Sequence, residues 1–336
     1  MAMSSSTPRP RGRATPRPRP LRDALVLAGL FALVLAGLAG LAAATGWEDT
    51  RAQIAKLAGW QIVALLGLSL CNYAARGLRW HLFTRRLGLG TSFAADFRHF
   101  LGGFAMSVTP GRLGELVRMR WIGRETGVAF ETTAPLMLVD RAFDLAALGL
   151  LLGAALAVSA TGIAFGLPVT LLALGGAVVA TRPALLAGLA TFGYRFTGRF
   201  GRLFARIRRA ARALAVFSAP GLMALAGGLG LLGWFAEGFA FHLLLVWMGA
   251  DIGLAKAVAI FVFSGLAGGL TGAPGGVGGA EAAMVALLAL EGVPLEASVP
   301  ATAIIRFTTL WFAIGIGLAV FPFAEKYSLR TAHALE

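Results

Sequence analysis

Cysteine is nearly absent from this sequence, since Cys71 is the single copy in 336 residues. One cysteine excludes an intrachain disulfide and a cysteine metal cluster. Histidine is also scarce, and its copies are scattered without the spacing of a metal site: His81, His99, His242 and His333. The sequence also lacks a Walker loop, a Rossmann fingerprint and a Ser/His/Asp array. We therefore expect no enzyme activity, no catalytic residue, no cofactor and no resident metal.

Charged residues are few as well. They make up 14% of the chain, whereas 57% is hydrophobic, and about twenty apolar residues suffice to cross a bilayer. The composition predicts an all-α polytopic membrane protein. The net charge of +14 does not indicate a nucleic-acid partner, because the arginines stand in blocks between apolar runs, as the positive-inside rule expects.

The apolar runs divide the chain into a single membrane domain, 22–323, between two cytoplasmic tails. The first tail, 1–21, is basic and rich in proline, which predicts disorder, and the second is 324–336. Six spans are expected, at 22–44, 58–78, 132–157, 162–181, 220–248 and 298–322. A basic amphipathic connector is expected at 182–212.

The second span ends near Arg76 and Arg79. We interpret these arginines, with Trp80 beside them, as part of a cytoplasmic flank. The same charge rule places both chain termini in the cytoplasm.

One apolar segment, 257–292, cannot be an ordinary spanning helix. Pro274 removes a backbone donor, and Gly275 and Gly278 belong to a run of glycines that weakens the helix. Broken backbone at membrane depth must be buried in protein or line a wet cavity. Glu281 places a carboxylate just after the break, and such a combination is typical of a transport site.

An earlier stretch repeats the pattern Pro-Gly-x-x-Gly, at Pro110, Gly111 and Gly114. A lone arginine follows each copy at nearly the same distance, Arg141 in the first and Arg306 in the second. We interpret these as two copies of one unit, at about 50–157 and about 217–323. The charge rule gives the copies opposite orientations, which predicts an inverted repeat with two broken re-entrant hairpins.

The region 93–128 leaves two alternatives open. Its apolar part is too short to cross a bilayer, so it either enters and returns as a re-entrant hairpin or lies at the interface as an amphipathic helix. Arg112, Glu115 and Arg118 are three residues apart, so they can pair along one helix face.

Charges inside the predicted spans are costly, at roughly 2.5–3.5 kcal/mol each on insertion scales. They should face inward and pair, or line a hydrated cavity. They are either structural ion pairs or a polar path for a headgroup, with Arg141 and Arg306 contacting phosphate. The candidate substrate-binding residues are Asp140, Arg141, Asp144, Glu237, Glu281 and Arg306, together with Arg112 and Glu115.

Asp140 and Asp144 allow a further alternative, because carboxylates at i,i+4 share a helix face and could hold Mg²⁺ against a pyrophosphate. Arg141 lies between them and can pair with Asp144 at i,i+3. We therefore favour neutralisation of the aspartates by arginine over metal binding.

Taken together, these motifs resemble a known family. The motifs are Asn72-x-x-x-Arg76-x-x-Arg79-Trp80, the stretch 110–115, Asp140-Arg141, the stretch 273–281 and Arg306. They are similar to the flippase-like membrane region of bacterial lysylphosphatidylglycerol synthases and their stand-alone relatives, over about 50–323. The resemblance implies a polytopic protein of the bacterial cytoplasmic membrane that moves a lipid between leaflets.

Members of that family can carry a cytosolic aminoacyl-transfer domain. This sequence ends at Glu336, so we expect no synthesis of lysyl lipid. The expected partners are membrane phospholipids and a separate lipid-modifying enzyme. Two alternatives stay open: an integral-membrane transferase or glycolipid-assembly protein that uses a lipid carrier, and a small-solute transporter with a narrow closed cavity.

Overall fold

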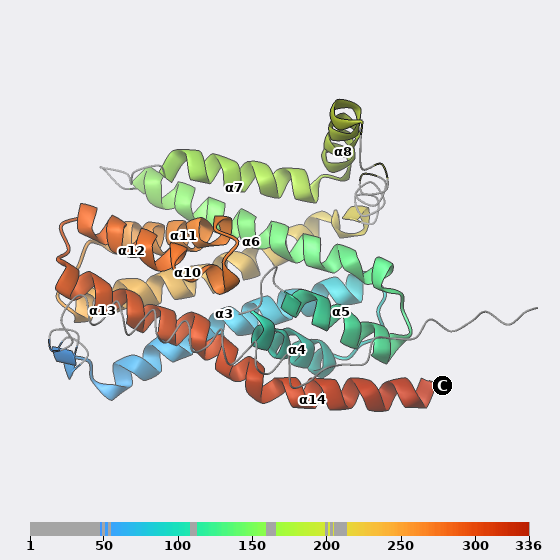
Figure 1. The fold of residues 1–336 in the computed structure, drawn as a ribbon, viewed down its shortest axis with the longest axis horizontal. Coiled ribbons are helices and arrows are strands. Elements are labelled where there is room, and N and C mark those ends of the chain that lie inside the picture. The colour runs from blue at the N-terminus through green and yellow to red at the C-terminus, as the bar shows by residue number, and fades with distance from the viewer. Residues whose placement is uncertain are drawn as a thin grey trace, which may run out of the picture.

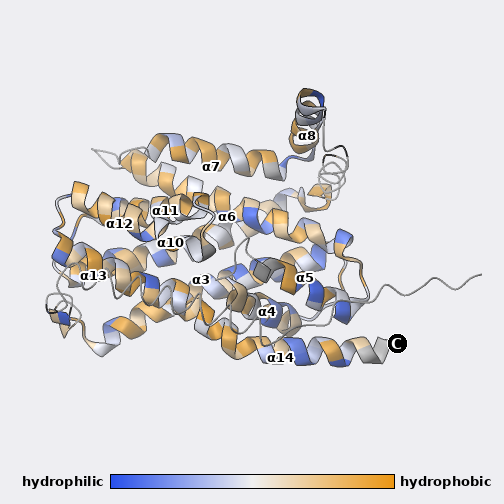
Figure 2. Ribbon diagram, viewed as in Figure 1, coloured by the Kyte–Doolittle hydropathy of each residue, from blue (hydrophilic) through white to orange (hydrophobic). Residues whose placement is uncertain are grey.

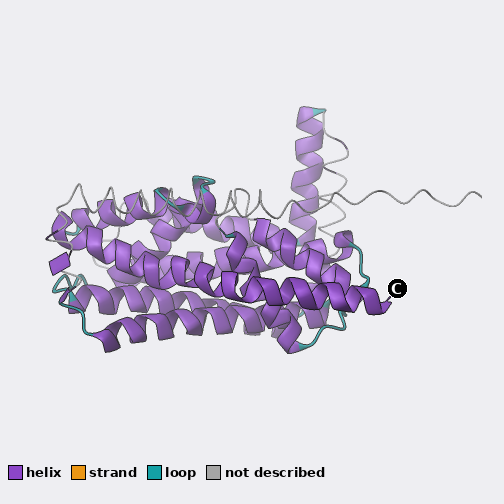
Figure 3. Ribbon diagram, turned by 60° about the horizontal axis from the view of Figure 1, so that its bottom comes forward, coloured by secondary structure: helices purple, strands orange, loops and turns teal. Residues whose placement is uncertain are grey.

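The computed structural model describes residues 48, 51–52, 55–107, 113–158, 166–198, 201, 204 and 214–335. Every regular element in those ranges is helical, as Figure 3 shows, which confirms the all-α prediction. The predicted tail 1–21 and first span 22–44 lie outside the described residues. The same holds for Pro110, Gly111 and Arg112.

Long helices run side by side and form the body of the molecule (Figure 1). Helix α3 packs along α10, and α6 packs along α7. Helix α13 continues into α14 through η5, a turn with π-helical hydrogen bonding. These elements have the following bounds: α3 Gly59–Arg86, α6 Phe130–Val158, α7 Gly166–Thr181, α10 Pro220–Trp247, α13 Leu295–Arg306, η5 Phe307–Trp311 and α14 Phe312–Leu335.

Two hairpins of short helices lie at opposite ends of this body (Figure 1). One contains α4, η1 and α5, and the other contains α11, η4 and α12. Opposite placement is what an inverted repeat predicts, although the repeat itself stays a prediction. The bounds are α4 Phe93–Gly102, η1 Gly103–Met106, α5 Leu113–Thr126, α11 Leu254–Leu270, η4 Pro274–Gly276 and α12 Gly279–Leu290.

The connector after α7 is helical in part. Helix α8 (Pro183–Thr197) bends by 98° from α7 and stands away from the other helices (Figure 1). A short 3₁₀ turn, η3 (Leu214–Phe217), precedes α10. Most of the remaining connector up to 212 lies outside the described residues.

Three described helices are long and apolar enough to cross a membrane: Phe130–Val158, Pro220–Trp247 and Leu295–Ala332. The bent pair α7 and α8 could add a fourth. Helix α3, predicted to span at 58–78, is not among them, because Asn72, Arg76 and other polar residues lower its hydropathy. The structure thus supports a polytopic membrane protein, and the count of six spans stays a prediction.

Hydropathy is distributed as a membrane protein requires. Apolar residues colour most of the long helices, while polar residues gather around α4, α5 and the end of α14 (Figure 2). On α7, Leu167, Leu171 and Leu172 are exposed. Such exposed apolar surface fits contact with lipid.

Helix α14 continues through the segment 324–335, where the sequence predicted a tail after 323. Glu325 explains the continuation, because its carboxylate lies 2.7 Å from Arg120 and 2.7 Å from Arg124 of α5. The indole of Trp121 also donates to Glu325. Upstream, α14 crosses η1 at Gly317, where an added Cβ would lie 2.2 Å from the backbone nitrogen of Ala105. This crossing therefore needs glycine.

Candidate functional site

A buried ion network joins α3 to α6. Arg79 of α3 is fully buried, and its Nη2 lies 2.6 Å from Asp140 Oδ1 and 2.6 Å from Asp144 Oδ1. Arg76 Nη2 lies 2.9 Å from Asp144 Oδ2. Arg141 contacts both aspartates at 3.1 Å, including the predicted i,i+3 pair with Asp144. Three arginines thus face two aspartates, which leaves the network with a net charge of +1.

Arg76 and Arg79 do not form an exposed flank, because both side chains are buried; the side of the membrane on which they lie stays a prediction. Asn72, Arg76 and Arg79 are spaced by four and three residues, so they share one face of α3. From that face Arg79 and Arg76 reach Asp140 and Asp144 of α6, whose buried carboxylates require partners. Pairing the buried arginines with the buried aspartates costs less free energy than leaving either group unpaired. This difference explains the arrangement.

The magnesium alternative at Asp140 and Asp144 loses support from the same contacts. Each carboxylate already accepts hydrogen bonds or ion pairs from at least two arginines. Such carboxylates are committed to guanidinium groups, and a cation would have to displace these.

A second ion pair holds the broken segment between α11 and α12. Arg306 Nε lies 2.6 Å from Glu281 Oε1, and Arg306 Nη2 donates to the Gly275 carbonyl at 2.9 Å. The other oxygen of Glu281 accepts from the Gly278 amide at 2.7 Å. Gly275 and Gly278 have positive φ angles of 61° and 84°, which glycine adopts at little cost. Glu281 therefore fixes both the break and Arg306.

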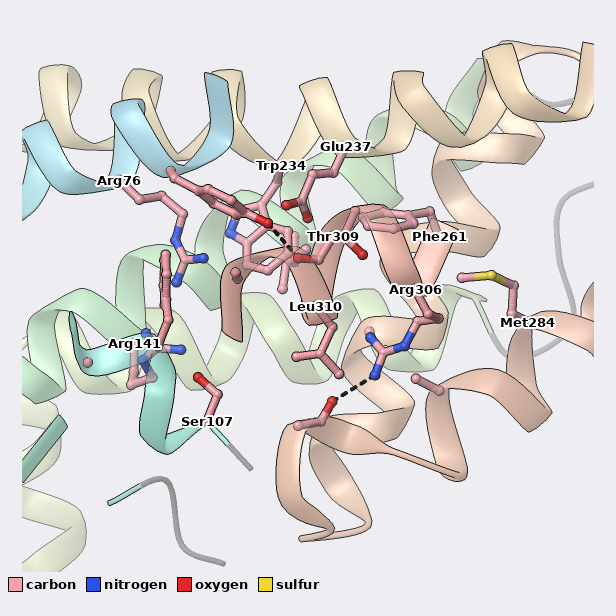
Figure 4. Close-up of a pocket in the computed structure, with 18 of the residues that line it drawn as sticks. Arg76, Ser107, Arg141, Trp234, Glu237, Phe261, Met284, Arg306, Thr309 and Leu310 are labelled. Carbon is pink, nitrogen blue, oxygen red and sulfur yellow. Dashed lines mark hydrogen bonds between the residues drawn. The ribbon is translucent and has the colours of Figure 1, made fainter. Parts of the chain in front are cut away.

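A cavity of about 210 Å³ lies between these two ion-paired groups. Figure 4 shows Arg76 and Arg141 on one side of it and Arg306 on the other. Its wall has charged, aromatic and other apolar parts. The charged and aromatic residues of the wall, with one methionine, are Arg76, Arg118, Arg141, Glu237, Arg306, Tyr73, Phe104, Trp234, Phe261 and Met284.

Glu237 differs from the other carboxylates of the site. It is buried on α10 and lines the cavity, where it is the one acidic residue among the described lining residues. Within the described part of the chain it makes no ion pair or hydrogen bond. Asp140, Asp144 and Glu281 instead hold arginines from behind the cavity wall.

The predicted site residues therefore fall into groups. Arg141, Arg306, Glu237 and Gly275 line the cavity, and Gly278 lies in the turn just before α12. The other residues are placed as follows: Pro274 starts η4, Gly114 lies in the first turn of α5, the side chain of Glu115 is outside the described set, and Arg112, Pro110 and Gly111 lie outside the described residues altogether.

Sequence reasoning missed the aromatic wall. Trp234 precedes Glu237 by one helical turn, its indole donates to Asp144 at 3.1 Å, and its ring lies 4.9 Å from the Arg76 guanidinium carbon. Tyr73 donates its hydroxyl to the Thr309 carbonyl, within the π-helical turn. The i,i+3 spacing of Trp234 and Glu237 was the available signal, since both residues then share a helix face.

The buried position of Arg118 among aromatic rings was also not predicted from the sequence. It is buried on α5, with its guanidinium carbon 4.5 Å from the Phe100 ring and 5.4 Å from the Trp80 ring. A cation against aromatic faces is stabilised by the ring quadrupoles. Gly103 permits this approach, because a Cβ there would lie 2.2 Å from Arg118 Nε.

The comparison with protein families agrees with the motifs. The sequence profile of the family described as "Lysylphosphatidylglycerol synthase TM region" matches residues 25–317. That range contains α3 to α13 and every residue of the cavity wall named above. No curated protein matched the chain in a separate search.

Proposed function

We propose that this chain, which belongs to the lysylphosphatidylglycerol synthase TM region family, is a lipid translocator that moves a phospholipid between the leaflets of the cytoplasmic membrane. The chain termini would face the cytoplasm. The observation that carries the proposal is the amphiphilic cavity, which places arginines and aromatic rings in one chamber inside a bundle of apolar helices.

The arginines suit a phosphate. A guanidinium fork forms two parallel hydrogen bonds to phosphate oxygens, and the low dielectric of a buried site strengthens them. The side chain of Arg141 is 27% exposed, whereas that of Arg79 is fully buried. Arg141 can therefore exchange an internal partner for a phosphate, while Arg79 anchors the two aspartates.

The size of the cavity suits a headgroup. At about 210 Å³, it falls below the roughly 300–1,000 Å³ of pockets that enclose drug-sized ligands. The acyl chains would stay among the apolar helix faces and the bilayer. A small-solute transporter needs no such apolar route. A transferase that used Asp140 and Asp144 would need these carboxylates free, whereas both are paired with arginines.

The sequence contains no ATP-binding motif, so we propose that transfer is passive or driven by a gradient. A lipid-modifying enzyme, acting separately, would supply or consume the lipid. Neither the energy source nor such an enzyme changes how the lipid-binding site is tested.

The test is leaflet-resolved transfer of a fluorescent phospholipid in proteoliposomes that contain this protein alone. Arg141→Lys and Arg306→Lys should insert and fold, yet lose most of the transfer, because a lysine point charge cannot replace a fork. Arg330→Lys, at an exposed position of α14, is the matched control and should keep the wild-type rate. Wild-type rates in both test variants would assign the arginines to structural ion pairing instead.

A further inference from the structure

We propose that Glu237, with the rings of Tyr73, Trp234 and Phe261, forms a subsite for the ammonium group of a lipid headgroup. The substrate class would then be a zwitterionic phospholipid, with one phosphate and one ammonium. This inference rests on the lipid translocation proposed above and adds a ligand for a carboxylate that the phosphate contacts leave unused.

The first support is the state of Glu237. A carboxylate buried without a partner is costly, and buried charges are normally paired. The other acids of the site follow that rule, since Asp140, Asp144 and Glu281 all bind arginine. Glu237 is 5% exposed and lacks such a partner among the described residues, while its side chain points into the cavity (Figure 4). An unpaired acid in this position is ready for a cation.

The second support is the aromatic surroundings. Trp234, Tyr73 and Phe261 line the same cavity as Glu237, and aromatic faces attract ammonium groups. The Trp234 ring already carries one cation, the guanidinium of Arg76. The Tyr73 hydroxyl is occupied by the Thr309 carbonyl, so its ring is held in place and only the ring remains to contact a ligand.

The third support is the distribution of charge. The network of Arg76, Arg79 and Arg141 with two aspartates carries one surplus positive charge, and Arg306 approaches from the other side. A phosphate fits the arginines, and Glu237 lines the same cavity as Arg76, Arg141 and Arg306. A purely anionic headgroup would bring a second negative charge toward Glu237, whereas an ammonium on the same headgroup would neutralise it.

A simpler role for Glu237 is that of a counter-ion that holds Arg76 and Arg306 without touching the lipid. The two roles differ in what they predict for headgroups. A counter-ion affects every lipid alike because it acts through the arginines, whereas an ammonium subsite affects only lipids that carry the ammonium.

The transfer experiment compares phosphatidylethanolamine with phosphatidylglycerol, both with the same fluorescent acyl chain, in proteoliposomes. Wild-type protein should transfer phosphatidylethanolamine about tenfold faster, since tenfold corresponds to one good charged contact of about 1.4 kcal/mol. Glu237→Gln keeps the shape and removes the charge, so the preference should vanish while phosphatidylglycerol transfer stays equal or rises. Glu296→Gln, at an exposed position of α13, should keep the preference.

Two results would overturn the subsite. One is an equal loss for both lipids in Glu237→Gln, which indicates the counter-ion role. The other is a preference that survives in that variant.

A binding measurement separates this inference from the proposed function. Purified protein in detergent is heated with dihexanoyl phosphatidylethanolamine or with its N-acetylated form, which keeps the phosphate and lacks the ammonium. The amine form should raise the unfolding temperature more in wild-type protein, and the difference should disappear in Glu237→Gln. If wild-type protein transfers neither lipid, the translocator proposal fails, and this shift still decides the subsite; equal shifts for both ligands would refute it.

Discussion

Arg79 shows how a single buried side chain organises the site. It is fully enclosed and bridges both aspartates of α6. Removing one member of a buried ion network leaves charges that are poorly solvated, and this is far more costly than the pair is worth when intact. Arg79 is thus an anchor for the position of Arg141, although it lies behind the cavity wall.

Arg79→Met should destabilise the protein by about 3 kcal/mol or more, measured as the change in free energy of unfolding in detergent. Arg85→Met is the control, because Arg85 is exposed in the last turn of the same helix. In the double variant with Asp140→Asn, part of the loss should be recovered through coupling between neighbours. Equal, small losses in Arg79→Met and the control would contradict the anchor role.

The sequence predicts those residues of the site whose charges would be too costly to expose to lipid. Arg141, Glu237 and Arg306 could be found because charges within apolar runs must face inward. Arg76 could not, because basic residues at the end of a span are equally typical of a cytoplasmic flank. Only the contact with Asp144, 68 residues away in the chain, distinguishes these two interpretations.

Among the elements, the crossing of α14 over η1 is the tightest contact. Gly317 faces the backbone of Ala105 and Phe104, with an added Cβ 2.2 Å from the Ala105 nitrogen. Gly315 lies on the same helix, and an added Cβ there meets nothing within 4 Å. The two glycines therefore differ in environment although they are close in sequence.

Gly317→Ala should force the helices apart and cost roughly 1–3 kcal/mol of stability, the usual range for overpacking. Gly315→Ala should be neutral or slightly stabilising, because alanine is the better helix former. Unfolding midpoints of both variants in the same detergent test this, and equal midpoints would show that η1 can move aside freely.

The break between α11 and α12 could be predicted from its proline and glycines, whereas the crossing at Gly317 could not. A proline followed by glycines weakens a helix locally, whatever surrounds it. A glycine inside an apolar helix can instead face lipid, a cavity or another backbone. The sequence does not distinguish Gly315 from Gly317, since the choice depends on where η1 packs.

At the scale of the whole molecule, the two hairpins at opposite ends of the body agree with the inverted orientation inferred from charge (Figure 1). The positions of the helix ends sharpen the test of membrane orientation. Asp251 and Thr197 are both exposed, so cysteines there can react if the reagent reaches their side of the membrane.

In a Cys71→Ser background, Asp251→Cys should react with an impermeant thiol reagent added outside cells, and Thr197→Cys should react only after permeabilisation. Arg86→Cys, exposed at the end of α3, should behave like Thr197→Cys. Labelling of Thr197→Cys in intact cells would show that the second unit has the opposite orientation, and it would contradict the inverted repeat.

The π-helical turn η5 affects the directions in which the side chains of α13 and α14 point relative to each other. A π turn holds one residue more than an α turn, and each residue of an α-helix advances the side chains by about 100°. The surplus residue therefore sets the phase between α13 and α14, so that Arg306 faces the cavity while Gly317 faces η1. In a continuous α-helix only one of these alignments would be kept. If the π turn moved toward the N-terminus past Arg306, it would rotate Arg306 relative to the cavity while the packing of α14 stayed the same.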